Sequence, residues 1–138
     1  MLQLWPKIII LLSAIYHLIA GIFVLGPKSW TIFFSKNTYD LKIPEQYEPR
    51  YEICLHFLGL MGIALSFHLF IVFYLGSIEV QKFSLITLAL LFITRALFRI
   101  IYKKLIFDAY QLSFKRSLFN IIFNILLGIF CFIGTNYL

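Results

Sequence analysis

Four long apolar runs, nearly free of charge, are the feature that most constrains what this chain can fold into. Three uncharged stretches follow Lys7, Glu52 and Arg116, and they hold 20, 26 and 22 residues. Each is long enough to cross a hydrocarbon core of about 30 Å as a helix. A fourth run follows Lys82, is uncharged for 12 residues up to Arg95, and then continues mostly apolar. We therefore expect four membrane spans.

The spans are expected to be helices, because only helices and closed barrels satisfy the backbone in lipid. The runs are continuous in Leu, Ile and Phe and lack the strict alternation of a barrel strand. Only 13% of the residues are charged, against about 25% in soluble domains, which argues against a soluble domain and excludes a disordered chain. The prediction is an all-α integral membrane four-helix bundle, one domain over residues 1–138, with helices at about 6–26, 53–76, 82–102 and 117–136.

The distribution of Lys and Arg predicts the orientation. The expected loops are loop 1 at about 27–52, a short loop 2 after the second helix, and loop 3 at about 103–116. Ten of the 12 basic residues lie in or beside loops 1 and 3, and only Lys7 and Lys82 lie on the other side. The positive-inside rule then places loops 1 and 3 in the cytoplasm and both termini outside. The net charge of +6 is explained as a topology signal, so we expect no nucleic-acid partner.

The first run has one alternative interpretation. An apolar run near the N-terminus can be a cleaved signal peptide instead of a retained span. No small-residue cleavage site follows this run, and we therefore expect a retained helix.

Hydrophilic side chains within the spans gather at the end that carries loops 1 and 3. Within each helix they are spaced three or four residues apart, which places them on one face. Polar groups inside a membrane avoid lipid, so we expect these faces to line a polar pocket that binds a ligand. The candidate ligand-binding residues are His17, Glu52, His56, Arg95, Arg99, Asn120 and Asn124.

Arg95 lies too far from the end of its helix to reach water easily, and an arginine deep in lipid costs roughly 2.5–3.5 kcal/mol. An ion pair with Glu52 would lower that cost. We therefore expect a contact of Glu52 with Arg95 or Arg99, directly or through His56.

Structural roles for the same residues stay open. Arg99 can snorkel to the headgroups. Asn120 and Asn124 can be interhelical hydrogen-bond donors worth roughly 0.6 kcal/mol each. His17 can be a hydrogen-bonded core histidine.

Several kinds of chemistry are not expected. No cysteine or histidine spacing predicts a metal site, and Cys54 and Cys131 lie too far apart for a disulfide. A haem needs two axial ligands at matching depth, and the three histidines give no clearly level pair, so we expect no cofactor.

The remaining interpretation is a site for an amphipathic lipid- or quinone-like ligand in an accessory membrane protein. Two alternatives stay open. One is a membrane enzyme that uses Glu52, His56 and Arg95 as catalytic groups for proton transfer on a hydrophobic substrate. The other is a structural subunit of a larger membrane complex. The expected partners are the lipid bilayer, a quinone or lipid ligand, and either a protein partner or a second copy.

The chain resembles the DoxX-like group of small four-helix membrane proteins. The similarity covers most of the chain and is carried by Tyr16-His17-Leu18-Ile19-Ala20-Gly21, Leu25, Pro27, Trp30, Arg50-Tyr51-Glu52, Gly59-Leu60-Met61-Gly62 and an arginine late in the third helix. The resemblance implies a four-helix bundle with a pocket at one end. Some relatives are implied to be quinone-linked oxidoreductase subunits, and others to assist the assembly of partner proteins. The predicted outside termini are a departure from that group.

Overall fold

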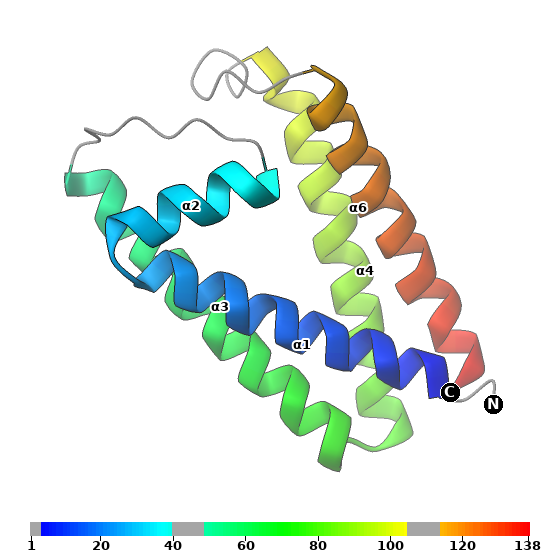
Figure 1. Cartoon of the computed structure of the whole chain (residues 1–138). Helices are drawn as coiled ribbons and strands as arrows, with labels where there is room; N and C mark the ends of the chain where they lie inside the picture. Colours follow the sequence, from blue (N-terminus) through cyan, green and yellow to red (C-terminus); the bar gives the residue numbers. More distant parts are fainter. Residues whose placement is uncertain (1–3, 40–48, 105–113) are drawn as a thin grey trace.

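A computed structural model of the chain describes residues 4–39, 49–104 and 114–138, and these are helical almost throughout (Figure 1). Its elements are α1 (Leu4–Leu25), α2 (Lys28–Tyr39), α3 (Pro49–Leu75), α4 (Ile78–Ile101), α6 (Phe114–Gly134) and the short 3₁₀ helix η1 (Thr135–Tyr137). No strand occurs in these three ranges. The all-α fold class is confirmed.

Four of the helices are long and apolar enough to cross a membrane. They are Leu4–Leu25, Glu52–Leu75, Ile78–Ile101 and Ser117–Tyr137. At 1.5 Å per residue each is roughly 32–36 Å long, which matches a hydrocarbon core of about 30 Å. The chain is therefore a multi-pass membrane protein, and the bounds of its four candidate spans lie within a few residues of the expected ones. Much of loop 3 lies outside the described residues.

The four long helices form two pairs, in which α1 packs against α3 and α4 packs against α6 (Figure 1). A Cβ atom on Gly21 of α1 would lie 2.8 Å from the carbonyl oxygen of Gly59 on α3. The α4–α6 pair has a similar close approach, where a Cβ on Gly128 would lie 3.2 Å from the Ala89 carbonyl oxygen. Small residues let membrane helices approach this closely and pack by van der Waals contact.

The pairs converge at the end where α1 begins and η1 ends, and their axes diverge toward the other end (Figure 1). We call the end where the pairs converge the Trp5 end, because the ring centres of Trp5 and Tyr137 lie 5.5 Å apart there. We call the end where they diverge the α2 end. The buried apolar cluster lies in the Trp5 half and draws on all four long helices, namely Ile10, Ala14, Leu69, Val72, Leu85, Leu88, Ala89, Phe92 and Cys131.

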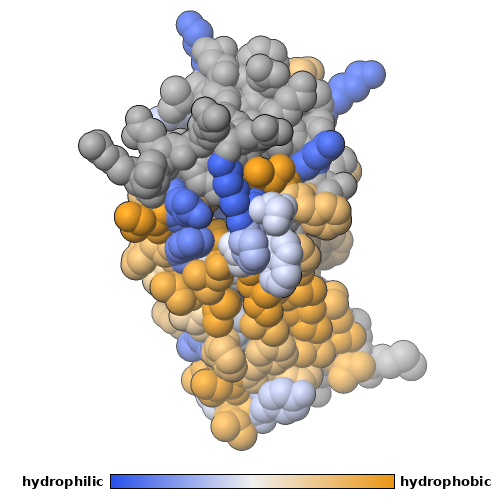
Figure 2. Space-filling view, turned by 60° about the vertical axis from the view of Figure 1, so that its left-hand side comes forward, coloured by the Kyte–Doolittle hydropathy of each residue, from blue (hydrophilic) through white to orange (hydrophobic). Residues whose placement is uncertain are grey.

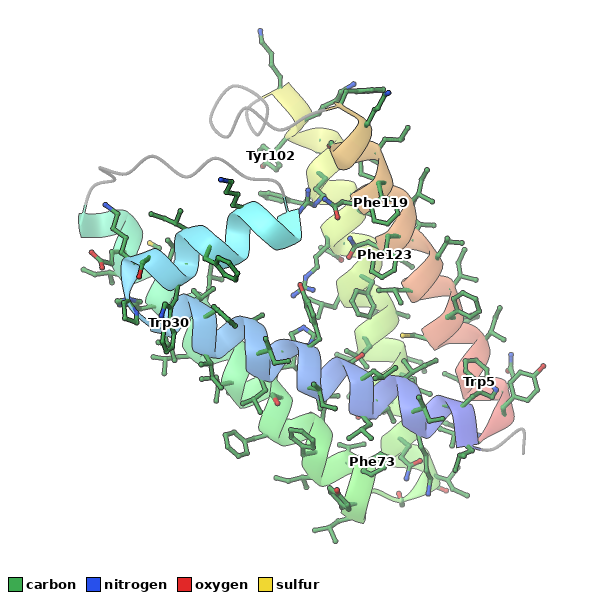
Figure 3. The ribbon with its side chains drawn as sticks, in the orientation of Figure 1. Trp5, Trp30, Phe73, Tyr102, Phe119 and Phe123 are labelled. Atoms are coloured by element: carbon green, nitrogen blue, oxygen red, sulfur yellow. The ribbon has the colours of Figure 1, made fainter. Side chains whose placement is uncertain are left out.

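The outer surface suits lipid. Figure 2 shows a face on which apolar side chains cover most of the area, whereas the described hydrophilic side chains gather mainly toward the α2 end. Trp5 and Trp30 lie at opposite ends of α1 (Figure 3), as aromatic residues at the two membrane interfaces do. Phe119 and Phe123 stack on the exposed side of α6 at 5.9 Å.

Loop 1 differs from the expectation, because its first part is the helix α2. The backbone N–H of Trp30 donates to the Pro27 carbonyl at 2.8 Å and starts the first turn. Thr31 is buried, and its hydroxyl donates to the Phe23 carbonyl at 3.2 Å, which ties α2 to the last turns of α1. Helix α3 also begins earlier than expected, at Pro49, since proline is favoured in a first helical turn. Residues 40–48 of loop 1 lie outside the described residues.

Candidate functional site

His17 is a buried histidine in the middle of α1, with 3% of its surface exposed. Its Nδ1 lies 2.7 Å from the carbonyl oxygen of Ser13, one turn earlier in the same helix. A carbonyl can only accept, so Nδ1 carries the hydrogen and donates it. The other ring nitrogen, Nε2, is then an acceptor, and the orientation of the ring is fixed by its own helix.

Arg95 of α4 meets that acceptor. Its Nη2 lies 3.4 Å from His17 Nε2, and its guanidinium carbon lies 5.9 Å from the centre of the Phe92 ring. The side chain is half-buried, six residues before the end of α4, or about 9 Å along the helix. The contact links α1 to α4 and therefore joins the two helix pairs within the membrane-spanning region.

Arg99 lies one turn beyond Arg95 on α4 and is half-buried. Residues four apart share a helix face, so both guanidinium groups belong to the same side of α4. Arg99 is in the last turn of the helix, where a positive charge interacts favourably with the helix dipole.

Asn120 and Asn124 lie on α6, and the packing of α6 against α4 sets their depth. Gly134 faces Leu85 and Gly128 faces Ala89 and Ile93, so the two helices run in opposite directions. Continuing the same register places Asn124 level with Arg95 and Asn120 level with Arg99. The amide nitrogen of Asn124 donates to the Asn120 backbone carbonyl at 2.7 Å.

The side chain of Asn120 is buried, with 7% of its surface exposed, and it shares a face of α6 with Gly128 and Cys131, which are also buried. Within the described ranges, its Nδ2 has no hydrogen-bond partner. A buried amide donor without a partner costs roughly 1–3 kcal/mol. A role in helix packing alone would therefore leave this donor unsatisfied at that cost.

Glu52 and His56 are half-buried in the first turns of α3, at the α2 end. Gly62 of the same helix is level with His17, since a Cβ there would lie 3.4 Å from the His17 carbonyl oxygen. Glu52 is ten residues away from Gly62, or about 15 Å along the axis. Among the described residues, no ion pair joins Glu52 to Arg95 or Arg99, and Arg95 contacts His17 instead.

Five of the seven predicted residues thus lie at the level of Arg95 or one turn beyond it, whereas Glu52 and His56 lie about 15 and about 9 Å from the level of His17 along α3. His17 and Arg95 are in contact, Arg99 follows on the same face, and Asn120 and Asn124 are level with the arginines. Sequence reasoning missed the backbone carbonyl of Ser13, which orients the imidazole. The signal for it was the spacing of Ser13 and His17, four residues apart and on one face.

The grouped side chains offer mainly hydrogen-bond donors. Guanidinium groups and the Asn120 amide NH₂ donate, the imidazole acceptor faces Arg95, and the side-chain oxygens of Asn120 and Asn124 are two further acceptors. Such a set can hold a polar group rich in acceptor atoms. Among residues 4–39, 49–104 and 114–138, no group of three His, Cys, Asp or Glu side chains could hold a metal ion, and both cysteines are free thiols.

No family model, no curated protein and no solved structure matches the chain.

Proposed function

We propose that this multi-pass membrane protein binds an amphipathic lipid- or quinone-like molecule in an accessory role. The head of the ligand contacts Arg95, Arg99 and Asn120 at the α2 end, and the tail lies against apolar side chains of the spans. The resemblance to the DoxX-like group, with its expected pocket at one end, belongs to the same proposal.

The observation that carries the proposal is the 3.4 Å contact between Arg95 and His17 inside the membrane-spanning region. An arginine inside a span costs roughly 2.5–3.5 kcal/mol. Helices can be joined without that cost, as Ser66 and Ala14 show, where a hydroxyl donates to a backbone carbonyl at 2.7 Å between α1 and α3. A permanent positive charge at this depth therefore favours a ligand-binding role over a packing role.

The enzyme alternative receives less support. Of its three proposed catalytic groups, Glu52 lies about 15 Å along α3 from the level of His17, where Arg95 makes its contact. The third alternative, a structural subunit of a larger complex, relies on the exposed apolar faces, and lipid covers such faces equally well.

The test is native mass spectrometry of the full chain, purified in mild detergent and exchanged into a second detergent. We expect a bound small molecule on the wild type and on Lys104→Gln, which removes an exposed positive charge at the same end of the bundle. Arg95→Gln should lose it while remaining helical by circular dichroism. A wild type without a retained molecule, or an Arg95→Gln variant that retains it equally, would contradict the proposal.

A further inference from the structure

Helix α2 is held at the depth where the first membrane span ends. The Thr31 hydroxyl donates to the Phe23 carbonyl at 3.2 Å, and Phe23 lies two residues before α1 ends at Leu25. Because α1 is about as long as the hydrocarbon core is thick, its end lies near the boundary between acyl chains and headgroups. Figure 1 shows α2 running crosswise to α3 and α4 at this end of the bundle. This depth and this direction are those of a helix in the plane of the membrane interface.

The outer side of α2 carries two large aromatic side chains. Thr31 is buried toward α1, whereas the side chains of Trp30 and Phe33 are 48% and 60% exposed. The other exposed side chains among the described ones of this helix are those of Ser29 and Lys36. The outer side therefore combines bulky aromatic groups with a hydroxyl and a positive charge.

These exposed residues occupy two different sides of the helix. Trp30 and Phe33 are three residues apart and share one side, whereas Ser29 and Lys36 are seven residues apart, or two turns, and share the other. Both aromatic rings contact the Phe23 ring of α1, at 5.9 and 6.3 Å, so the aromatic side adjoins the membrane span. An aromatic side next to the span and a polar side beside it match a boundary that has acyl chains on one side and headgroups on the other.

We propose that α2 is an in-plane interfacial helix that inserts Trp30 and Phe33 into the lipid leaflet at the α2 end, at the boundary between headgroups and acyl chains. The partner of this surface is phospholipid, because the surface continues directly from a membrane span and because tryptophan is enriched at headgroup level. The Lys36 stem lies along the same boundary with its ammonium among the headgroups. The proposal concerns the outer surface of α2 and does not depend on the ligand proposed for the bundle.

The test is tryptophan fluorescence of the full chain in phosphatidylcholine vesicles. The sequence has two tryptophans, so Trp5→Phe leaves Trp30 as the only emitter. Three quenchers report its surroundings, namely lipid brominated near the headgroup end of the acyl chains, lipid brominated near the methyl end, and aqueous iodide. We expect the first to remove most of the Trp30 emission and the other two to remove a small part of it.

Every other quenching pattern overturns the proposal. Strong quenching by iodide with none by either lipid would place α2 in water. Strongest quenching by the deep bromine would place Trp30 in the hydrocarbon core. Absence of quenching by all three would mean that protein covers Trp30, which in this preparation is a second copy of the chain.

Two substitutions by the same residue test the assigned sides. Phe33→Gln removes a ring from the aromatic side, and Lys36→Gln, one turn further along, removes the charge from the polar side. In the Trp5→Phe background, we expect Phe33→Gln to lose much of the quenching by the shallow bromine and to gain quenching by iodide. Lys36→Gln should resemble its parent, with the circular dichroism of both variants unchanged. Equal quenching in the two variants would overturn the assignment of the sides.

Discussion

Arg95 Nη2 lies 3.4 Å from His17 Nε2, and this contact joins the α4–α6 pair to the α1–α3 pair inside the membrane-spanning region. The imidazole can accept there because its Nδ1 hydrogen is held by the Ser13 carbonyl, 2.7 Å away. The α2 end, where the two pairs diverge, therefore has a polar link in place of the apolar packing found at the Trp5 end.

The link should behave as a coupled pair. His17→Leu would leave the Arg95 guanidinium facing an apolar side chain, and we expect the free energy of unfolding to fall by roughly 1–3 kcal/mol. The double variant His17→Leu/Arg95→Leu replaces both partners with apolar groups and should be closer to the wild type. Thermal unfolding of the purified protein in detergent, followed by circular dichroism, measures both. A double variant less stable than His17→Leu would show that the two side chains act independently.

The close crossing of α1 and α3 predicts a large difference between two glycines. Gly21→Ala would place a Cβ 2.7 Å from Ile63 Cγ1 and 2.8 Å from the Gly59 carbonyl oxygen, so the helices must separate. We expect a loss of about 1–3 kcal/mol in unfolding free energy. Gly62→Ala is the matched control, since its nearest neighbour would be 3.4 Å away, an ordinary contact. Equal thermal stability of the two variants would contradict the crossing.

Much of the fold could be predicted from the sequence, because membrane spans are defined by the absence of charge over a fixed length. The run after Lys82 was the hardest case, since a span there requires Arg95 and Arg99 to lie within the helix, and α4 includes both. The grouping of polar residues at one end was predictable for the same reason. Chain direction alternates from span to span, so the depth of each residue follows from its distance to a loop.

The partners of individual side chains could not be predicted, because two side chains at the same depth in the membrane need not touch each other. Opposite charge predicts that Glu52 contacts Arg95. In the structure His17 is closer in depth to Arg95 and makes the contact instead. Helix α2 was missed because its sequence has neither a long apolar run nor a clear amphipathic period. It is formed by tertiary contacts of Thr31 with the Phe23 carbonyl and of the Trp30 ring with Phe23 at 5.9 Å.

The attachment of α2 to α1 depends on the Thr31 hydroxyl. Thr31→Val keeps the shape of the side chain but removes the hydrogen bond to the Phe23 carbonyl, which costs about 1 kcal/mol. We expect faster amide hydrogen exchange in Lys28–Tyr39 and unchanged exchange in α4. Thr87→Val is the control, because that exposed hydroxyl bonds only within its own helix, to the Phe83 carbonyl at 3.0 Å. Unchanged exchange in α2 would show that its aromatic contacts hold it against α1 without the Thr31 hydrogen bond.

The orientation predicted by the positive-inside rule can be tested from both ends of the bundle. Lys36→Cys labels the α2 end and Asn136→Cys the Trp5 end, where both native side chains are exposed, in a background with Cys54 and Cys131 replaced by serine. A membrane-impermeant maleimide should modify Asn136→Cys in intact cells and Lys36→Cys only after permeabilisation.

This prediction does not depend on the arginines of the candidate site. Setting aside Arg95 and Arg99, which lie within α4, still leaves eight basic residues on the side of loops 1 and 3 against two on the other. Because the rule counts Lys and Arg in short loops and near the ends of spans, the expected direction is unchanged. The reverse labelling pattern would place the α2 end outside and would mean that these basic residues serve binding and not topology.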